Sequence, residues 1–219
     1  MTTIAILPAK SFDRAKRRLS PGLQLGRHRA LIEAMFTDAL IAIGRTASVT
    51  QTFVVTADQT AARLAVGYGS DVIDDTADSH SGAAALGIAR ALELGATRAL
   101  LIPGDCPLLD PTELDSLLAR PVSGRSALIV PDRHGEGTNA LLLSPPDVLT
   151  PAFGEGSRQR HVDLAIAQGA TPEIVEVPSL GLDIDTPKDL EALVERFQTT
   201  RGGAANTRGF MNQLMRSQA

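Results

Sequence analysis

Residues 99–107 read Ala-Leu-Leu-Ile-Pro-Gly-Asp-Cys-Pro, an apolar run that ends in a turn containing an aspartate. The run is short, so it predicts a buried strand rather than a helix. The Ala-rich stretch Gly82–Leu94 before it has the composition of a helix that Gly95 would end, and Pro111 after it would open another helix. The whole stretch therefore predicts a strand between two helices, with Asp105 just past the carboxyl end of the strand.

The same alternation extends over most of the chain. Strands are predicted at Ile4–Leu7, Thr52–Thr56, Asp71–Ile73, Ala99–Ile102, Ala127–Val130, Asn139–Leu143 and Glu173–Val177. Helices are predicted at Leu25–Ile43, Gln59–Val66, Gly82–Leu94, Pro111 to about Leu118, Ser157–Ala167 and Pro187 to about Phe197. This order predicts an α/β fold with a mostly parallel central sheet and helices on both faces. Where the rhythm changes, near residues 130–160, we expect a small insertion that covers the site.

Length and composition restrict the class of protein. The 219 residues fit one domain, 1–198, followed by a polar tail, 199–219, that we expect to be flexible or loosely docked. A net charge of −4 gives no basic surface of the kind that binds duplex nucleic acid. The 3% of aromatic residues argues against base stacking on single strands. No apolar run approaches the ~18 residues of a membrane span. The single cysteine fits a reducing compartment, and the N-terminus does not read as a signal peptide, so we expect a cytoplasmic protein.

A second aspartate cluster, Leu182-Asp183-Ile184-Asp185-Thr186-Pro187, precedes the last predicted helix. In an extended segment, residues two apart point to the same side, so Asp183 and Asp185 can share a cation. Ligands of such sheets bind at the carboxyl ends of the strands, where Asp105 is also expected. The three carboxylates predict a hard-cation site, and such sites usually hold phosphates. Thr186 is predicted to be the N-cap of that helix, with Pro187 at its first position. The alternative for the three carboxylates is a set of turn caps and surface acids.

A cationic loop follows the first predicted strand, with Lys10, Arg14, Lys16, Arg17 and Arg18. The chain has no GxGxxG or Walker A motif. A cationic loop can instead neutralise a triphosphate and stabilise the charge on a departing pyrophosphate. We select Lys10 and Arg18, followed by Lys16, as nucleotide-binding residues. The alternative is a solvated run of charges.

Two glycine-containing segments are candidates for anion binding. Gly82 would let backbone N–H groups approach an anion or a base, although plain helix packing explains it equally well. The segment Phe153-Gly154-Glu155-Gly156-Ser157 looks like an anion nest that opens a helix, and the Thr138 hydroxyl could assist it. Together they would hold a second phosphate. For His161 a structural and a functional role both stay open, and Cys106 is more typical of a small buried residue than of a nucleophile.

These segments resemble the 2-phospho-L-lactate or phosphoenolpyruvate guanylyltransferases of coenzyme F-420 biosynthesis, within the nucleotidyltransferase superfamily. The resemblance runs from about Ile4 to Phe197. It rests on five motifs, namely Pro8-x-Lys10 with Ala15-Lys16-x-Arg18-Leu19, Gly104-Asp105-Cys106-Pro107, Gly137-Thr138-Asn139-Ala140, Phe153-Gly154-x-Gly156-Ser157-x-x-x-His161 and Leu182-Asp183-Ile184-Asp185-Thr186-Pro187. One departure is Gly82-Ala83-Ala84-Ala85, where the family usually has a Gly-Leu-Asn-Ala-like stretch.

The resemblance implies a Rossmann-like nucleotidyltransferase fold, GTP as the donor and Mg²⁺ as the cofactor. It implies that magnesium lies on Asp105, Asp183 and Asp185, and that the nucleotide binds at Pro8, Lys10, Lys16, Arg18 and Gly82. Lys10, Arg18 and Asp105 would be the catalytic residues. The phosphate of a three-carbon acceptor would bind at Thr138, Gly154, Gly156 and Ser157. Phosphoenolpyruvate is favoured as acceptor over 2-phospho-L-lactate and 3-phospho-D-glycerate, although no motif separates the three.

Other functions stay open at this point. The chain could be a nucleotidyltransferase for a sugar phosphate or the molybdenum cofactor, or a glycosyltransferase, because Asp183-Ile184-Asp185 is formally a DxD motif. A non-catalytic nucleotide-binding regulator is the alternative outside enzymes. The expected partners are GTP and a small phosphorylated acid, with no nucleic acid and no membrane. Product hand-over to the next pathway enzyme and a homodimer are both compatible with the sequence, which does not determine the oligomeric state.

Overall fold

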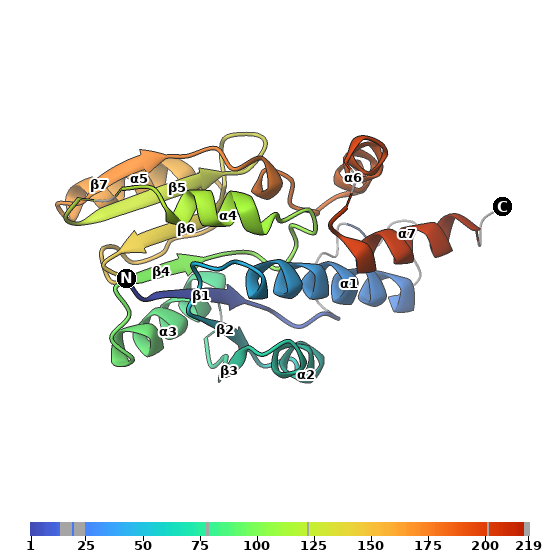
Figure 1. Cartoon of the computed structure of the whole chain (residues 1–219), viewed down its shortest axis with the longest axis horizontal. Helices are drawn as coiled ribbons and strands as arrows, with labels where there is room; N and C mark the ends of the chain where they lie inside the picture. The colour runs from blue at the N-terminus through green and yellow to red at the C-terminus, as the bar shows by residue number, and fades with distance from the viewer. Residues whose placement is uncertain (14–18, 20–24, 78, 122, 201, 217–219) are drawn as a thin grey trace.

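A seven-stranded sheet forms the centre of the protein (Figure 1), in the strand order β3-β2-β1-β4-β6-β5-β7. The structure is a computed structural model, which describes residues 1–13, 19, 25–77, 79–121, 123–200 and 202–216. Within these residues the strands are β1 Thr3–Pro8, β2 Gln51–Thr56, β3 Asp71–Asp74, β4 Arg98–Leu101, β5 Ser126–Pro131, β6 Thr138–Ser144 and β7 Thr171–Ile174.

The direction of β6 brings its first residues to the functional edge of the sheet. The described strands other than β6 all run the same way, and β6 is antiparallel to both of its neighbours, β4 and β5. The amino end of β6, at Thr138, therefore lies at the same edge as the carboxyl ends of β1 and β4. The mostly parallel sheet expected from the sequence is confirmed.

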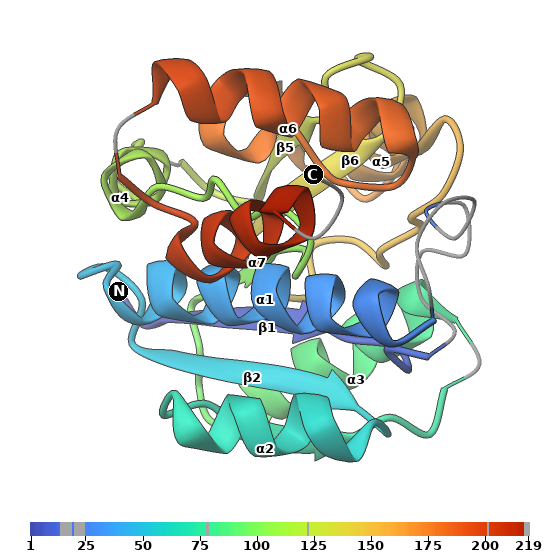
Figure 2. The same ribbon diagram turned by 90° about the vertical axis from the view of Figure 1, so that its right-hand side faces the viewer.

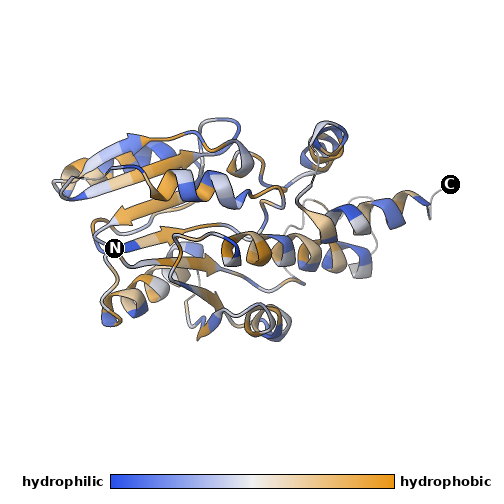
Figure 3. Ribbon diagram, viewed as in Figure 1, coloured by the Kyte–Doolittle hydropathy of each residue, from blue (hydrophilic) through white to orange (hydrophobic). Residues whose placement is uncertain are grey.

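Helices cover both faces of the sheet (Figures 1 and 2). They are α1 Leu25–Gly44, α2 Gln59–Gly67, α3 His80–Glu93, α4 Pro111–Leu118, α5 Ser157–Ala167, α6 Pro187–Thr199 and α7 Ala205–Arg216. Alternate strand residues enter two cores. Ala5 and Leu7 pack with α1 and α4 on one face, whereas Ile4 and Ile6 pack with α3 on the other. Both faces of β1 are thus apolar, as expected for a strand covered on both sides, and Figure 3 shows apolar residues along the strands.

Most predicted elements agree with the structure within a few residues, and two places differ. The last strand spans Thr171–Ile174 and not Glu173–Val177. Its pairing with β5 ends at Ile174, and Val175 and Val177 are buried where the chain continues past β7. The segment near 130–160 was expected to be an insertion. It supplies β6 to the middle of the sheet, and the stretches 132–137 and 151–156 form loops on either side of it.

The C-terminal segment differs from the flexible or loosely docked tail that its composition predicted. Residues 205–216 form α7, which lies along α1 (Figure 2). The buried Asp38 carboxylate of α1 accepts hydrogen bonds from the backbone N–H groups of Asn206 and Thr207, at 3.1 and 2.8 Å, and from both of their side chains. Met211 is buried against the same core. Polar anchoring of this kind leaves no apolar pattern in the sequence. No helix of the described residues is long and apolar enough to cross a membrane.

Candidate active site

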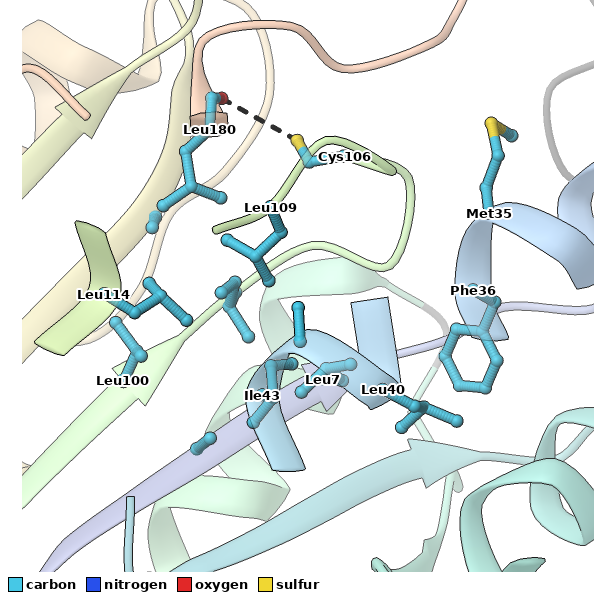
Figure 4. Packing of buried hydrophobic residues seen from close by; sticks show 14 of the residues in the cluster. Leu7, Met35, Phe36, Leu40, Ile43, Leu100, Cys106, Leu109, Leu114 and Leu180 are labelled. Carbon is cyan, nitrogen blue, oxygen red and sulfur yellow. Dashed lines mark hydrogen bonds between the residues drawn. The ribbon is translucent and has the colours of Figure 1, made fainter. Parts of the chain in front are cut away.

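The two aspartate clusters lie side by side at the carboxyl edge of the sheet. The backbone N–H of Ile184 donates a hydrogen bond to the carbonyl of Asp105 at 3.2 Å. The buried Cys106 thiol donates to the carbonyl of Leu180 at 3.7 Å (Figure 4). The amide of Asn139, on β6, donates to the same carbonyl at 2.6 Å. The loop after β4, the start of β6 and the segment before α6 are therefore tied together, and the prediction of Cys106 as a small buried residue is confirmed.

The Asp183 carboxylate lies in an environment that disfavours its charge. Burial raises its pKa, and the nearby carboxylates of Asp105 and Asp185 raise it further, against the hydrogen bond that Asn139 Nδ2 donates to it at 3.2 Å. The ionised form of such a group is disfavoured until a positive charge arrives. The three aspartates also line one cavity of about 680 Å³. The electrostatics of this edge therefore favour a bound cation.

The donor set fits magnesium that arrives with a nucleotide. Among the described residues, no group of three or more His, Cys, Asp or Glu side chains is arranged so that it could hold a metal ion by itself. Mg²⁺ commonly takes only one or two protein carboxylates and completes its shell with water and substrate phosphates. Oxygen donors without a complete protein cage, as at Asp105, Asp183 and Asp185, are consistent with that mode of binding.

Asp189 holds the second cluster in place, a role that the sequence reading missed. Its Oδ2 accepts hydrogen bonds from the backbone N–H groups of Asp185 and Thr186, at 3.0 and 2.7 Å, and from the Thr186 hydroxyl at 2.8 Å. Arg133, from the loop between β5 and β6, forms an ion pair with the same carboxylate. Thr186-Pro187-Lys188-Asp189 has the spacing of a capping box, so this pattern could have identified Asp189. Thr186 is the N-cap of α6, as expected.

The predicted acceptor residues line the same 680 Å³ cavity as the three aspartates. Thr138, Gly154, Gly156 and Ser157 all contribute to its wall. Gly156 has a φ of 67°, a left-handed conformation that glycine adopts without strain, and it is the N-cap of α5. The amino end of α5, with its partial positive charge, thus begins at the cavity wall.

The hydroxyl of Ser157 has an unused capacity for hydrogen bonds. The side chain is 1% exposed, and its Oγ has no hydrogen-bond partner among the described residues. The buried hydroxyls of Ser126 and Ser179 also lack partners, but neither residue lines this cavity. A buried hydroxyl without a hydrogen-bond partner destabilises the protein, and a ligand that bonds to the hydroxyl would remove this penalty. This observation supports an anion site at the start of α5.

Behind Thr138 lies His161, whose ring is fully buried. The backbone N–H of Ala152 donates to His161 Nε2 at 3.0 Å, and His161 Nδ1 lies 3.0 Å from Thr138 Oγ1. Burial lowers the pKa of His161 to about 4, with a smaller contribution from the charge of Arg160. The ring is therefore neutral near pH 7, and its two hydrogen bonds link the start of β6 to the loop that precedes α5.

The residues predicted to bind the nucleotide lie next to the predicted acceptor residues, with Asp105 between them. Pro8 and Lys10 line a 250 Å³ cavity together with Asp105 and His80, and the last two residues also line the acceptor cavity. Lys10 further borders a third cavity of 770 Å³. The first strand and the loop after β4 thus bring a lysine and a carboxylate to one place, as the sequence predicted.

Lys10 has a partner that the sequence did not suggest. Its ammonium donates to the buried carboxylate of Asp75 at 2.6 Å and to the carbonyl of Ala77 at 3.0 Å. A single aspartate after a short strand carries no recognisable pattern, so only the fold reveals the pair. Lys16 and Arg18, also predicted to bind the nucleotide, lie outside the described residues.

Gly82 does not line any of these three cavities. Its backbone N–H donates to the Ser79 side chain at 3.0 Å, which caps α3. A Cβ at this position would lie 2.8 Å from the Cβ of Ala77. The packing explanation that the sequence left open therefore accounts for this glycine, and the neighbouring residues Ser79, His80 and Ser81 line the acceptor cavity in its place.

Solved structures of nucleotide transferases have the same fold as this chain. The structure is similar to a protein from Desulfovibrio desulfuricans described as a nucleotide-diphospho-sugar transferase, with a TM-score of 0.72 and 16% sequence identity over 99% of this chain and 98% of the other. It is also similar to a nucleotidyl transferase from Methanothermobacter, with a TM-score of 0.66 and 18% identity over 91% of this chain and 99% of the other. At these identities the likeness establishes the Rossmann-like fold.

Sequence relatives narrow the class to one family. The family model "Guanylyl transferase CofC like" matches residues 3–215, so the chain belongs to this family. A phosphoenolpyruvate guanylyltransferase from Conexibacter woesei is 52% identical, over 99% of this chain and 98% of the relative. A 3-phospho-D-glycerate guanylyltransferase from Colwellia psychrerythraea is 34% identical, over 88% and 91%. A 2-phospho-L-lactate guanylyltransferase from Methanothermobacter thermautotrophicus is 27% identical, over 98% and 92%. The family match includes α7, which lies beyond the predicted limit of the resemblance at Phe197.

Proposed function

We propose that this guanylyltransferase transfers GMP from GTP to the phosphate of a phosphorylated three-carbon acid, with phosphoenolpyruvate as the favoured acceptor. The observation that carries the proposal is the meeting of two cavities at Asp105, each lined by residues predicted to bind an anion. The cavity of Pro8 and Lys10 lies on one side of this residue, and the cavity of Thr138 and Ser157 lies on the other. Two phosphate-bearing substrates could thus react across a shared carboxylate.

Similarity favours phosphoenolpyruvate among the three acids. The relative named for it is 52% identical, whereas those named for 3-phospho-D-glycerate and 2-phospho-L-lactate are 34% and 27% identical. The acids share a phosphate and a carboxylate on three carbons. We therefore assign the shared phosphate to the Thr138 and Ser157 side of the cavity. A pyrophosphate-release assay with each acid identifies the acceptor.

In the proposed reaction, an oxygen of the acceptor phosphate attacks the α-phosphorus of GTP. The new oxygen–phosphorus bond forms as the bond from the α-phosphorus to the bridging oxygen breaks, and pyrophosphate leaves with that electron pair. A phosphate monoester has a second pKa near ~6, so the nucleophile is already mostly dianionic at neutral pH. No general base is required. His161 is not placed to act as one, because its Nε2 already accepts the Ala152 N–H.

The protein's task is then to hold two anions together. Lys10, whose ammonium already sits beside Asp75, would neutralise the triphosphate. The Ser157 hydroxyl and the amino end of α5 would hold the acceptor phosphate. We also assign a triphosphate-binding role to Lys16 and Arg18. Asp105, Asp183 and Asp185 would hold a magnesium ion, which would supply positive charge to offset that of the phosphates.

Pyrophosphate release tests the proposal. The protein is incubated with GTP, magnesium and each of the three acids in turn, and with glucose 1-phosphate as a sugar-phosphate control. We expect release that requires both GTP and a three-carbon acid, fastest with phosphoenolpyruvate. Release with the sugar phosphate alone would favour the sugar nucleotidyltransferase alternative, and GTP binding without turnover would favour a regulator.

Two sets of variants test the assignment of residues. Ser157→Ala should raise the KM of the acceptor by about 10- to 100-fold, the typical value of a hydrogen bond to a charged group, and leave the KM of GTP unchanged. Ser126→Ala removes another buried hydroxyl without a partner, outside the cavity, and is the matched control. Each of the single variants Asp105→Asn, Asp183→Asn and Asp185→Asn should lose most turnover. Near-normal turnover at saturating magnesium would contradict the metal role of that residue.

The proposal places this reaction in coenzyme F-420 biosynthesis, in the cytoplasm. Its product would pass to the next enzyme of that pathway, and the working form would be a homodimer. Light scattering of the purified protein tests the dimer, and a rise in turnover on adding the downstream enzyme tests the hand-over.

A further inference from the structure

His161 connects the two loops that carry the predicted acceptor residues. Its Nδ1 lies 3.0 Å from the hydroxyl of Thr138, at the start of β6. Its Nε2 accepts the backbone N–H of Ala152 at 3.0 Å, one residue before the loop of Phe153 and Gly154. The ring of Phe153 also stacks edge-on against His161, with 5.2 Å between centroids. His161 does not line the cavity, so it can act on a substrate only through these neighbours.

The hydrogen bonds determine which ring nitrogen carries the proton. A backbone N–H can only donate, so Nε2 must be the acceptor and cannot carry a proton. The neutral ring then carries its proton on Nδ1, and this N–H donates to the oxygen of Thr138. The tautomer follows from the hydrogen-bond network. Burial, which lowers the pKa of His161 to about 4, keeps the ring in this neutral state at neutral pH.

The tautomer in turn sets the direction of the Thr138 hydroxyl. A hydroxyl can donate one hydrogen bond and accept two. Because His161 donates to Thr138 Oγ1, the Thr138 proton cannot point back at the ring. Thr138 lines the acceptor cavity, so the proton is available to donate toward a phosphate oxygen there. With the opposite tautomer, the Thr138 hydroxyl would donate its proton to Nδ1. Only the lone pairs of its oxygen would then face a phosphate, which they would repel.

We propose that His161 is a positioning residue that orients the Thr138 hydroxyl as a hydrogen-bond donor to the acceptor's phosphate. The inference rests on the proposed function, in which Thr138 faces that phosphate. His161 is thus a determinant of acceptor affinity, although it touches neither substrate. Its contact with Ala152 is a second and separable contribution, which holds the glycine loop against the same wall.

Two substitutions separate these contributions. In His161→Asn, the side-chain amide nitrogen can take the place of Nδ1 and still donate to Thr138. In His161→Gln, the longer side chain reaches the position of Nε2 and can accept from Ala152, but the donor to Thr138 is lost. We expect His161→Gln to raise the acceptor KM by roughly 10-fold, the usual scale for one hydrogen bond, and His161→Asn to raise it far less. The KM of GTP should stay unchanged in both variants.

A purely structural histidine would give a different pattern. Both variants would then lose thermal stability and activity together, and the two KM values would change alike. Thr138→Val supplies the second test, because without the hydroxyl there is nothing to orient. In the Thr138→Val background, His161→Gln should have no further effect on the acceptor KM. Equal effects of the Asn and Gln variants, no effect of Gln, or additive effects in the Val background would each overturn the proposal.

A measurement on the unaltered protein keeps the inference testable if a variant fails to fold. Long-range ¹H–¹⁵N NMR spectra of ¹⁵N-labelled protein at pH 7.5 distinguish the histidine tautomers by the shifts of the two ring nitrogens. We expect a protonated Nδ1 and an unprotonated Nε2 for His161. A protonated Nε2, or protons on both nitrogens, would refute the orientation of Thr138.

Turnover assays and the tautomer measurement test the proposed function and the positioning role of His161 separately. If the unaltered protein turns over none of the three acids, the proposed function is wrong, and the tautomer measurement alone then decides whether His161 directs the hydroxyl. If the protein is active but the Asn and Gln variants behave alike, only the positioning role is wrong.

Discussion

Lowering the pH from 7.5 to 5.0 is expected to weaken the fold through the buried ring of His161. Its pKa in the folded protein is about 4, against 6.5 for an ordinary histidine. Between these two values the unfolded chain binds a proton that the folded chain does not. Stability therefore falls as the pH decreases from about 6.5 and levels off below about 4.

The magnitude follows from the two pKa values. At pH 7.5 neither state is protonated to a significant extent, and the contribution is close to zero. At pH 5.0 the unfolded chain is almost fully protonated at this site, whereas the folded chain is about one-tenth protonated. The difference amounts to roughly 2 kcal/mol in the free energy of unfolding. In a chain of this size, this corresponds to about 4–8 °C in Tm.

Urea unfolding at the two pH values measures this effect, with His161→Asn as the comparison. The other titrating groups are common to both proteins, so the difference between their stability changes isolates His161. The variant should lose about 2 kcal/mol less than the unaltered chain between pH 7.5 and 5.0. Parallel losses in the two proteins would show that His161 titrates normally, and the reasoning on its burial would be refuted.

Three further predictions concern stability. Asp183→Asn should stabilise the metal-free protein at pH 7.5, because burial and the neighbouring carboxylates disfavour the ionised form of this group. A less stable variant in urea unfolding with EDTA would contradict this. Gly87→Ala should lower the free energy of unfolding by about 1–3 kcal/mol, because the added Cβ would lie 2.3 Å from Ile6 Cγ2. Gly209→Ala should instead stabilise α7 by about 0.5–1 kcal/mol, because its Cβ would meet nothing within 4 Å. Thermal melts that gave the two alanines the same sign would refute the packing. Asp38→Asn should lower the free energy of unfolding by roughly 2–3 kcal/mol, because one of the two oxygens that accept hydrogen bonds from α7 is lost. Amide hydrogen exchange in residues 205–216 should become faster. Unchanged exchange there would show that other contacts hold α7 in place.

Local features of the fold could be predicted from the sequence. The apolar run at 99–102 indicated β4, and Thr186 was recognisable as a helix N-cap. These signals are local because a cap and its helix are neighbours in the chain. The placement of β6 between β4 and β5 had no such signal, since strand pairing joins residues far apart.

The candidate site divides in the same way. Asp105 and Asp183 were recognisable because each follows or lies within an extended segment next to a turn. The Lys10–Asp75 ion pair spans 65 residues, and the Asp38 contacts to α7 span more than 160. A residue pattern shows that a side chain is polar or buried but not which distant group satisfies it. His161 is the clearest example, because its role depends on two partners from separate loops.

We propose that GTP and a small phospho-acid react across Asp105. Phosphorus-31 NMR of a mixture of GTP, phosphoenolpyruvate, magnesium and the protein tests it most directly. We expect loss of the GTP signals, release of one pyrophosphate per GTP consumed, and new paired signals of a diphosphate that joins GMP to the acceptor phosphate. None of these changes should occur without the acid. Release of inorganic phosphate and GDP, or GTP consumption that does not depend on any three-carbon acid, would contradict it.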